Sequence, residues 1–278
     1  MNYYNITMAL ALAGLLTACS PADQGQQENA APTGAATEAA ADAGKTVLPD
    51  YIKAAVDNPA RPDTARQRDA GRRPGEVIEF FGIKPGMRIL EMAAGGGYYS
   101  QILDSVVGPE GRLIAQNSPG KFYEERIKGT FEPLVAGLHN TEAMVARLAT
   151  AELAPNSLDG VVIILIYHHM HYNKDQGEKL PDGTVALLNK FKAALKPGGF
   201  IGIVEHAAPD DYTRAASAPL HRVPPPVVRA DLTGLGFELA AESDILMNDT
   251  DDRSKYWRES TPRGQTARLV MKFVKPAN

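Results

Sequence analysis

The sequence predicts a doubly wound α/β fold, in which helices cover both faces of a mostly parallel β-sheet. Short apolar segments rich in β-branched residues alternate with amphipathic segments, which is typical of parallel strands joined by right-handed crossovers. The segment 161–166 is apolar at every position, so both of its faces must be covered, as in a central parallel strand. The chain has 278 residues, of which 44% are hydrophobic and 22% charged, and this fits one large globular domain behind an N-terminal extension.

The predicted elements follow one another in a regular order. Strands are expected at residues 88–92, 112–117, 161–166, 200–204, 237–239 and 268–274. Helices are expected at residues 77–81, 98–107, 184–195 and 227–235, where apolar residues recur at helical spacing. Glycine and proline pairs such as Pro85-Gly86 and Gly108-Pro109 separate these elements, as turn residues do.

The N-terminus has the pattern of an export signal. Residues 8–18 form an uncharged apolar run that is too short to span a bilayer but fits the apolar part of a secretory signal. The run ends in Leu16-Thr17-Ala18-Cys19, which resembles the lipobox of bacterial lipoproteins. The resemblance implies cleavage before Cys19, acylation of that cysteine and, because Ser20 follows, anchoring to the outer membrane on its periplasmic side.

The domain boundaries follow from a change in composition. Residues 20–46 contain no aromatic and no β-branched aliphatic residue, so they cannot bury enough apolar surface to fold. We therefore expect a signal peptide at residues 1–18, a lipidated cysteine with a disordered tether at 19–46, and a globular domain at 47–278.

The net charge and the cysteine count argue against nucleic-acid binding and against stabilisation by an internal disulfide. A formal net charge of −4 does not suit a protein that binds the nucleic-acid backbone. The single cysteine excludes an internal disulfide. The charged runs are expected to form solvated faces with local ion pairs; they are Asp251-Asp252-Arg253 and the arginines Arg61, Arg66, Arg68, Arg72 and Arg73. Arg72-Arg73-Pro74, just before the first predicted helix, is also placed where it could close a ligand cleft.

Polar residues gather where the predicted strands end. The places are the glycine-rich turn after Leu90, Gln116-Asn117, Tyr167-His168-His169 and Glu205-His206. In doubly wound sheets ligands bind beyond the carboxyl ends of the strands, near the point where the strand order reverses. We therefore expect the functional site at this edge, where tyrosines such as Tyr98 and Tyr167 either form an apolar wall or fill the core.

The turn Ala93-Ala94-Gly95-Gly96-Gly97 lets a ligand approach the backbone, and the following helix offers free N–H groups to an anion. A nicotinamide dinucleotide site would have a third glycine where Ser100 stands and an acid in place of Gln116 or Asn117. A phosphate-binding P-loop is excluded because no Gly-Lys-Ser/Thr follows the turn.

Three segments, in this order along the chain, resemble landmarks of class I S-adenosylmethionine-dependent methyltransferases. They are Glu91-x-Ala93-x-Gly95-x-Gly97, Leu158-Asp159-Gly160-Val161-Val162 and Leu195-Lys196-Pro197-Gly198-Gly199. Over roughly residues 60–275 the chain resembles, more narrowly, an exported branch of predicted methyltransferases, through Gly95-Gly96-Gly97-Tyr98-Tyr99, Tyr167-His168, Glu205-His206-Ala207 and His221-Arg222. The resemblance implies a Rossmann-like, seven-stranded sheet with one antiparallel strand, S-adenosylmethionine as cofactor and a small-molecule methyl acceptor.

The resemblance also implies which residues contact the cofactor. They are Glu91, Ala93, Gly95, Gly96, Gly97, Gln116 and Asn117. Glu91 is the loop acid, and Ala93 replaces one of the family's glycines. The family acid that holds the ribose corresponds to Asn117 or Gln116, and a second acid near the adenine is absent at Ala149-Thr150. These differences leave open an alternative, a non-catalytic methyltransferase-like lipoprotein of the cell envelope.

The histidines supply candidate catalytic groups. A hydroxyl or amine acceptor needs a base, and histidine suits that role near neutral pH. His168 and His206 end adjacent predicted strands, so they are the candidate bases, with Glu205 as an orienting group; a purely structural role, capping strands or bonding the backbone, stays open for each histidine. His168, His169 and His171 are also possible metal ligands, but no carboxylate or cysteine accompanies them at a suitable spacing, and no metal site is predicted.

Overall fold

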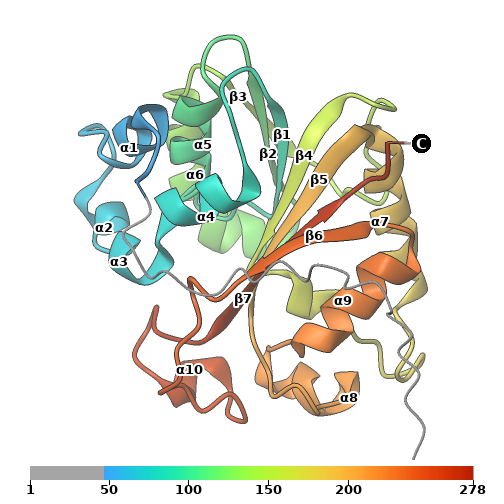
Figure 1. Cartoon of the computed structure of the whole chain (residues 1–278). Helices are drawn as coiled ribbons and strands as arrows, with labels where there is room; N and C mark the ends of the chain where they lie inside the picture. Colours follow the sequence, from blue (N-terminus) through green and yellow to red (C-terminus); the bar gives the residue numbers. More distant parts are fainter. Residues whose placement is uncertain (1–46, 278) are drawn as a thin grey trace, which may run out of the picture. The chain divides into compact units, whose positions relative to one another are not determined.

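The computed structural model describes residues 47–277 (Figure 1). The predicted signal peptide at residues 1–18, the tether and the acylated Cys19 therefore lie outside the described residues. Between residues 47 and 277 no helix is both long enough and apolar enough to cross a bilayer.

A seven-stranded sheet runs through the molecule in the order β3-β2-β1-β4-β5-β7-β6 (Figure 1). Its strands are β1 (Arg88–Met92), β2 (Arg112–Asn117), β3 (Thr141–Val145), β4 (Leu158–Ile164), β5 (Leu195–His206), β6 (Glu238–Ser243) and β7 (Arg268–Val274). β7 pairs antiparallel with β5 and β6, while the pairs among β1 to β5 are parallel. The predicted doubly wound sheet with one antiparallel strand is confirmed.

The strand order reverses at β1. This strand pairs on one side with β2, where Leu90 faces Ile114, and on the other with β4, where Leu90 faces Val161. Connections that leave β1 and β4 at their carboxyl ends diverge to opposite sides, which opens a crevice above the sheet edge. The glycine-rich turn after β1 and the histidines after β4 both lie there.

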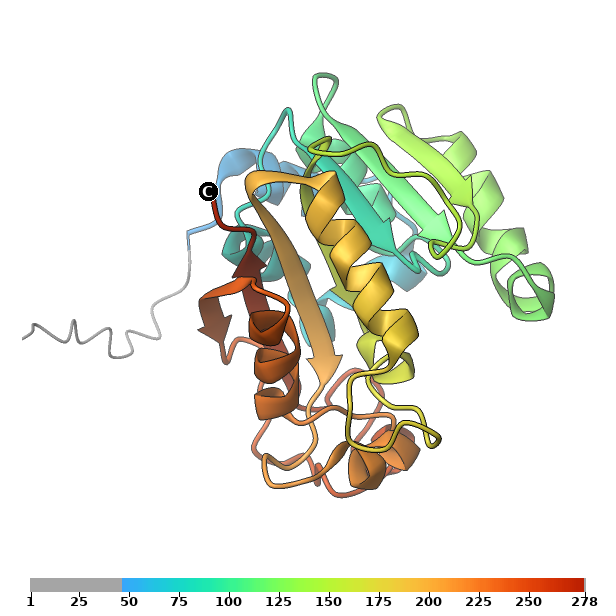
Figure 2. The same ribbon diagram turned by 90° about the vertical axis from the view of Figure 1, so that its right-hand side faces the viewer.

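Helices cover both faces of the sheet. They are α1 (Asp50–Val56), α2 (Asp63–Arg66), α3 (Asp69–Arg72), α4 (Pro74–Phe81), α5 (Ser100–Val107), α6 (Lys128–Ala136), α7 (Asp182–Ala194), α8 (Arg214–Ser217), α9 (Pro225–Gly234) and α10 (Trp257–Ser260). Short helical turns add η1 (Tyr123–Ile127), η2 (Tyr167–His169) and η3 (Ala218–Leu220). Figure 2 shows α7 and α9 in front of the sheet, and residues of α1, α4 and α5 pack on the opposite face.

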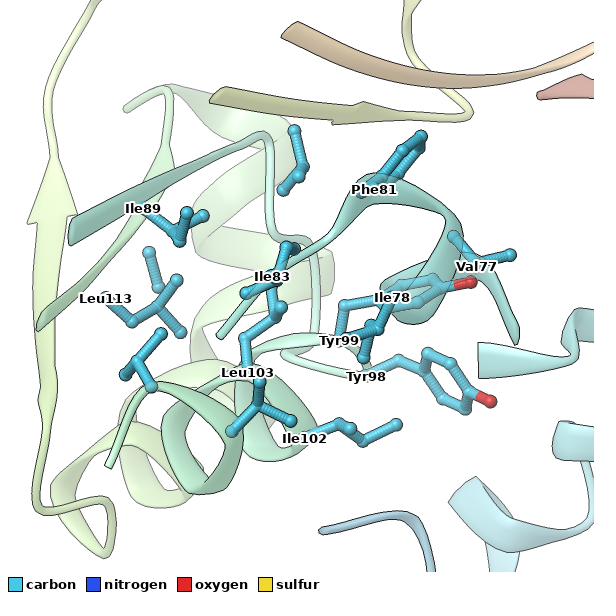
Figure 3. Packing of buried hydrophobic residues seen from close by; sticks show 14 of the residues in the cluster. Val77, Ile78, Phe81, Ile83, Ile89, Tyr98, Tyr99, Ile102, Leu103 and Leu113 are labelled. Atoms are coloured by element: carbon cyan, nitrogen blue, oxygen red, sulfur yellow. The ribbon is translucent and has the colours of Figure 1, made fainter. Parts of the chain in front are cut away.

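Alternate residues of each central strand enter two separate cores. Ile89 and Val162 join the cluster under α1, α4 and α5, whereas Leu90 and Val161 join the cluster under α7 and α9. Figure 3 shows the first cluster, in which Ile83, Ile89 and Leu103 lie close together. Burial on both faces explains why these strands are apolar at consecutive positions.

Two features of the sheet are among those that the sequence did not predict. β3 is a short edge strand whose residues are half-buried or exposed, so it lacks the apolar pattern of its neighbours. β5 begins at Leu195, directly after α7, and the Lys-Pro-Gly-Gly segment forms an irregularity within it, between the pairs Leu158–Leu195 and Gly160–Phe200.

Candidate active site: two adjoining cavities at the sheet edge

The glycine-rich turn between β1 and α5 has an unusual backbone. Ala93, Gly95 and Gly97 have φ angles of 52°, 59° and 83°, in the left-handed region. Glycine adopts this region without strain, whereas an alanine there costs about 1–2 kcal/mol. The strain at Ala93 lies beside a cavity, which is where strained backbone is often found.

The first cavity opens above this turn and has a volume of about 620 Å³. Four of the predicted cofactor residues line it, namely Glu91, Ala93, Gly95 and Gly96. A Cβ atom on Gly95 would meet no other atom closer than 4.0 Å, so this glycine faces open space. Tyr98 and Tyr99 also line the cavity without filling it, and Figure 3 shows the two rings next to each other.

Gly97 has a different environment from the one predicted. It does not line the cavity, and a Cβ atom there would lie 2.2 Å from Leu134 Cδ2. Leu134 belongs to α6, which packs against the turn. The predicted contact of Gly97 with the cofactor stays a prediction, and in the described geometry its lack of a side chain serves the close approach of α6.

Gln116 and Asn117 hold the turn from behind. Asn117 Oδ1 accepts a hydrogen bond from the Gly95 N–H at 2.9 Å, and Asn117 Nδ2 donates to the Gly95 carbonyl at 3.0 Å. Gln116 Oε1 accepts from the Ala93 N–H at 3.1 Å, and Gln116 Nε2 donates to the Ala146 carbonyl at 2.7 Å. Both side chains are buried and neither lines the cavity. Their predicted contact with a ribose stays a prediction, and the described geometry gives them a positioning role.

Glu91 is buried at the floor of the first cavity. Its Oε2 accepts a hydrogen bond from Ser100 Oγ at 2.6 Å. Burial raises the pKa of Glu91 to about 8, and the Ser100 bond and the charge of Arg72 oppose this only in part. The carboxyl group is therefore largely protonated at neutral pH.

A second cavity, of about 640 Å³, adjoins the first. Thr64, Arg68, Arg72 and Leu165 line both, so the two spaces meet along these side chains. Two predicted catalytic residues, His168 and His206, line the second cavity.

Glu205 holds His168 in one orientation. The His168 ring donates from Nδ1 to Glu205 Oε1 at 2.9 Å, and the His168 backbone N–H donates to Oε2 at 3.1 Å. Burial alone would raise the pKa of Glu205, but its contacts with His168 and His206 outweigh this and keep the pKa below the usual value. An ionised carboxylate on Nδ1 leaves the lone pair of Nε2 available to accept a proton.

His206 is more enclosed than His168. Its Nδ1 lies 2.8 Å from Thr266 Oγ1, and its ring stacks on Trp257 with centroids 4.9 Å apart and an interplanar angle of 13°. Burial lowers the pKa of His206 to about 4, so the ring is neutral near pH 7. A base with so low a pKa is weak, and His168 is the better placed of the two candidates.

Two further histidines, His169 and His221, lie beside His168, whereas His171 lies apart from them. The metal-ligating atoms of His168, His169 and His221 all lie within 4.8 Å of one another. His171 is instead buried between the His168 carbonyl and Ser217 Oγ, away from the cavity. His221 comes from the loop before α9, which places it far from the other two in sequence.

The arginines divide into paired and unpaired groups. Arg61, Arg66 and Arg73 form the expected local ion pairs, with Asp69, Asp63 and Glu76. Arg68 and Arg72 instead line the cavities, and Arg61 is buried, so the expectation of a solvated face is wrong for these three. The Asp251-Asp252-Arg253 run is not simply a solvated face either, because Asp251 forms a fully buried ion pair with Arg222 at 2.8 Å.

The C-terminal wall of the second cavity was not predicted from the sequence. Tyr256, Trp257, Arg258, Arg263 and Arg268 line it, from the long connection between β6 and β7 and from the first residue of β7. The signal was available in the length of that connection, because long irregular loops in a compact domain often carry function.

Comparison with known proteins agrees with this architecture. A sequence-family model of protein-L-isoaspartate(D-aspartate) O-methyltransferase matches residues 57–128. The chain is 35% identical over 52 residues to the protein-L-isoaspartate O-methyltransferase of Methanothermobacter thermautotrophicus, covering 19% of this chain and 24% of that protein. It is 25% identical over 133 residues to the ubiquinone/menaquinone biosynthesis C-methyltransferase UbiE of Ectopseudomonas mendocina, covering 48% of this chain and 47% of that protein. The chain thus spans about half or less of the length of these curated relatives.

Solved structures are similar over more of the chain. A SAM-dependent methyltransferase from Aquifex aeolicus superposes with a TM-score of 0.53 at 18% identity, covering 77% of this chain and 98% of that one. A SAM-dependent methyltransferase from Methanosarcina mazei gives a TM-score of 0.52 at 14% identity, with 73% and 98% covered. The chain has the fold of class I S-adenosylmethionine-dependent methyltransferases, and part of its sequence is related to theirs.

Proposed function

We propose that this protein is an S-adenosylmethionine-dependent methyltransferase that acts on a small molecule or an envelope component. The observation that carries the proposal is the first cavity, which the glycine-rich turn forms at the carboxyl end of β1, where the strand order reverses. Ligands of doubly wound sheets bind at this point. The similar proteins named above are all methyltransferases, which supports the same function here.

The residues around the first cavity fit such a cofactor. Gly95 and Gly96 present bare backbone to the space, and its volume lies within the range of cofactor sites. Glu91 and the turn would hold the cofactor at its polar end, and Tyr98, Tyr99 and Leu134 would enclose it.

The two cavities suggest a division of labour. S-adenosylmethionine supplies an activated methyl group, so the chain's own tasks are to align the acceptor and to remove its proton. The acceptor would occupy the second cavity, because His168 and His206 line that one and not the first. His168 would take the proton at Nε2, with Glu205 fixing the ring through Nδ1.

A second candidate is a non-catalytic envelope protein that kept the sheet and lost the cofactor. The use of Gln116 and Asn117 to brace the turn, in place of a ribose-binding acid, favours it. A cleft closed by Tyr98 or Tyr99 would favour it further, but both side chains leave the first cavity open. The open cavity makes the enzyme the better supported of the two.

The proposed location is the periplasmic side of the outer membrane, through acyl chains on Cys19. We predict that Cys19→Ala releases the protein in soluble form, because a cysteine that is absent cannot carry the lipid anchor. Cell fractionation with immunoblotting measures the distribution. A variant that stays with the membranes, or a wild type that never enters them, contradicts the anchor.

Calorimetric titration of the full-length protein with S-adenosylmethionine and S-adenosylhomocysteine tests the activity proposal. We expect saturable binding of both and a rise in the melting temperature, since a ligand that binds the folded state stabilises it. Absence of both heat and thermal shift at millimolar ligand would refute the enzyme and leave the non-catalytic candidate.

A further inference from the structure

We propose that the second cavity binds the methyl acceptor as an organic oxyanion, a carboxylate or phosphate group carried on an aromatic body. This inference rests on the proposed function for its link to methyl transfer, and it names the chemical class of the acceptor. The oxyanion is the group by which the acceptor is recognised and held.

The lining of the second cavity is strongly cationic. Five arginines line it, namely Arg68, Arg72, Arg258, Arg263 and Arg268, and no aspartate or glutamate does. The whole chain carries a formal net charge of −4, so this concentration of positive charge is local. A cavity lined with charge of one sign raises the local concentration of ligands of the opposite sign.

None of these five guanidinium groups forms an ion pair with a carboxylate among residues 47–277, in contrast to other enclosed arginines. Arg61 lies 2.7 Å from Asp69, Arg222 lies 2.8 Å from Asp251, and Arg214 pairs with Asp231. The chain therefore supplies acids where arginines are structural, whereas Glu205, the acid behind the second cavity, binds His168 and not these arginines.

Arg268 is the most telling of the five arginines without a carboxylate partner, because it is only 5% exposed. Its Nε donates to the Thr266 carbonyl, and its Nη2 donates to the Gly71 and Gly264 carbonyls. Among residues 47–277 its Nη1 makes no hydrogen bond, and this atom is not fully buried. The charge of Asp251 acts on Arg268, but Asp251 is paired directly with Arg222, and an anion in the cavity would give Arg268 a direct partner.

Arg68 and Arg72 both lie near the ring of Tyr98 and repel each other. Their guanidinium carbons lie 4.8 and 4.5 Å from the ring centroid, which compensates part of the cost. Burial lowers the pKa of Arg68, and the charges of Arg72 and Arg263 lower it further. The α2–α3 segment and the connection before β7 thus bring like charges together, a geometry that suits the two oxygens of a carboxylate or phosphate.

Aromatic side chains form the remaining wall. Tyr256, Trp257 and Phe122 line the same cavity, and Trp257 is stacked on His206. Phe122 is 71% exposed, which is unusual for a large apolar side chain in the absence of a ligand. These groups favour an acceptor whose anionic group is attached to a planar apolar body.

The charge also decides between an anion and a metal ion. His168, His169 and His221 are close enough to share a cation such as Zn²⁺. A divalent ion would add positive charge to a cavity that already holds five arginines and no lining acid. An oxyanion is attracted by the same arginines and can accept hydrogen bonds from the imidazole N–H groups, so the anion is the favoured ligand.

The single tryptophan of the chain provides a local probe. Trp257 is the only tryptophan, and it lines the second cavity, so its fluorescence reports on the immediate surroundings of this cavity. We would titrate the full-length protein with phenyl phosphate and benzoate, and in parallel with benzyl alcohol and benzylamine, which have similar rings but no negative charge. We expect saturable fluorescence changes with the two anions, weaker binding at high salt, and little response to the other two.

Two arginine variants and one control locate the binding. Arg263→Gln and Arg68→Gln should each weaken phenyl phosphate binding about tenfold or more, since each removes a charge-assisted hydrogen bond. Arg147→Gln is the matched control, because Arg147 is exposed, lines neither cavity and carries the same charge. The affinity of Arg147→Gln for phenyl phosphate should equal that of the wild type.

Three outcomes would overturn the inference. They are equal binding of benzylamine and phenyl phosphate, equal loss in Arg147→Gln and Arg263→Gln, and stoichiometric Zn²⁺ binding that depends on His221 without any anion binding. The titration with S-adenosylhomocysteine is independent of all three. If S-adenosylhomocysteine binds while the anions do not, the acceptor class is wrong and the methyltransferase proposal stands. If the anions bind while S-adenosylhomocysteine does not, only the methyltransferase proposal is refuted.

Discussion

The two cavities are built by different means, although they share four side chains. The first opens above the backbone of the glycine-rich turn, which has left-handed φ angles. The side-chain amides of Gln116 and Asn117 brace that turn from behind. The second is shaped by side chains that converge from α2–α3, η2 and the connection before β7, and it contains cations that the chain does not neutralise. A site formed mainly by backbone suits a cofactor that does not differ between related enzymes. A site formed by side chains suits an acceptor that does differ between them.

This contrast predicts that changes in the two cavities separate into different kinetic effects. Changes in the second should alter turnover or acceptor affinity while cofactor affinity stays constant. Changes in the first should alter cofactor affinity directly.

The largest expected effect is on the rate. His168→Ala should reduce methyl transfer by about 10²–10⁴-fold, because loss of a positioned base typically costs that much. Transfer of labelled methyl groups from S-adenosylmethionine to an envelope extract measures the rate, and calorimetry with S-adenosylhomocysteine should show unchanged affinity.

His139→Ala is the control for this change, because His139 is exposed and lines neither cavity. A full rate in His168→Ala would show that the acceptor atom needs no proton removed, as when the oxyanion itself is methylated. A parallel loss of cofactor affinity would contradict the division into two cavities.

The next largest effect is expected when a new side chain obstructs the first cavity, the proposed cofactor site. Gly95→Leu should weaken S-adenosylhomocysteine binding by about a hundredfold, roughly 3 kcal/mol, because the new side chain would project into the first cavity. Gly177→Leu is a matched control: Gly177 has a φ of 62°, close to the 59° of Gly95, and also faces open space, but it lines neither cavity. Both variants carry similar backbone strain, so equal loss of binding in the two would show that strain, not obstruction, is responsible.

The fold was predictable because its pattern is local. β4 is apolar on consecutive residues, and burial on both faces of a central strand requires that. β3 was not predicted, because an exposed edge strand does not need to be apolar on consecutive residues. Of the site, the turn and the histidines after the strands were predictable, since the carboxyl ends of parallel strands meet at one edge.

The cationic wall was not predictable from sequence spacing. Arg66 and Arg68 look alike in the sequence, yet Arg66 pairs with Asp63 one turn away while Arg68 faces the cavity. Arg263 joins Arg68 only through the close approach of Gly71 to Gly264, where an added Cβ would lie 2.6 Å from a carbonyl oxygen. Such a contact depends on tertiary packing alone.

A smaller effect is expected on the pH dependence of stability. Between the ordinary carboxyl pKa and about 8, folded Glu91 holds a proton that the unfolded chain has lost. The free energy of unfolding should therefore fall as pH rises, by about 2 kcal/mol from about pH 6 to about pH 8, and level off above that. Glu91→Gln should remove this slope, whereas Glu110→Gln, at an exposed turn, should keep it. Denaturant unfolding at several pH values measures both, and equal slopes in the two variants would contradict the raised pKa.

An effect of comparable size distinguishes two roles for Asn117. If it braces the turn, Asn117→Ala should lower the free energy of unfolding without any ligand by about 1–3 kcal/mol, since the Gly95 N–H and carbonyl both lose their partner. If it only contacts a ribose, stability without ligand should not change and only cofactor affinity should fall. Asn173→Ala is the control, because Asn173 is exposed and its side chain accepts one bond, from the Asp175 N–H. A bracing role also predicts that cofactor affinity falls through misplacement of Gly95, so the drop in ligand-free stability is the result that separates the two roles.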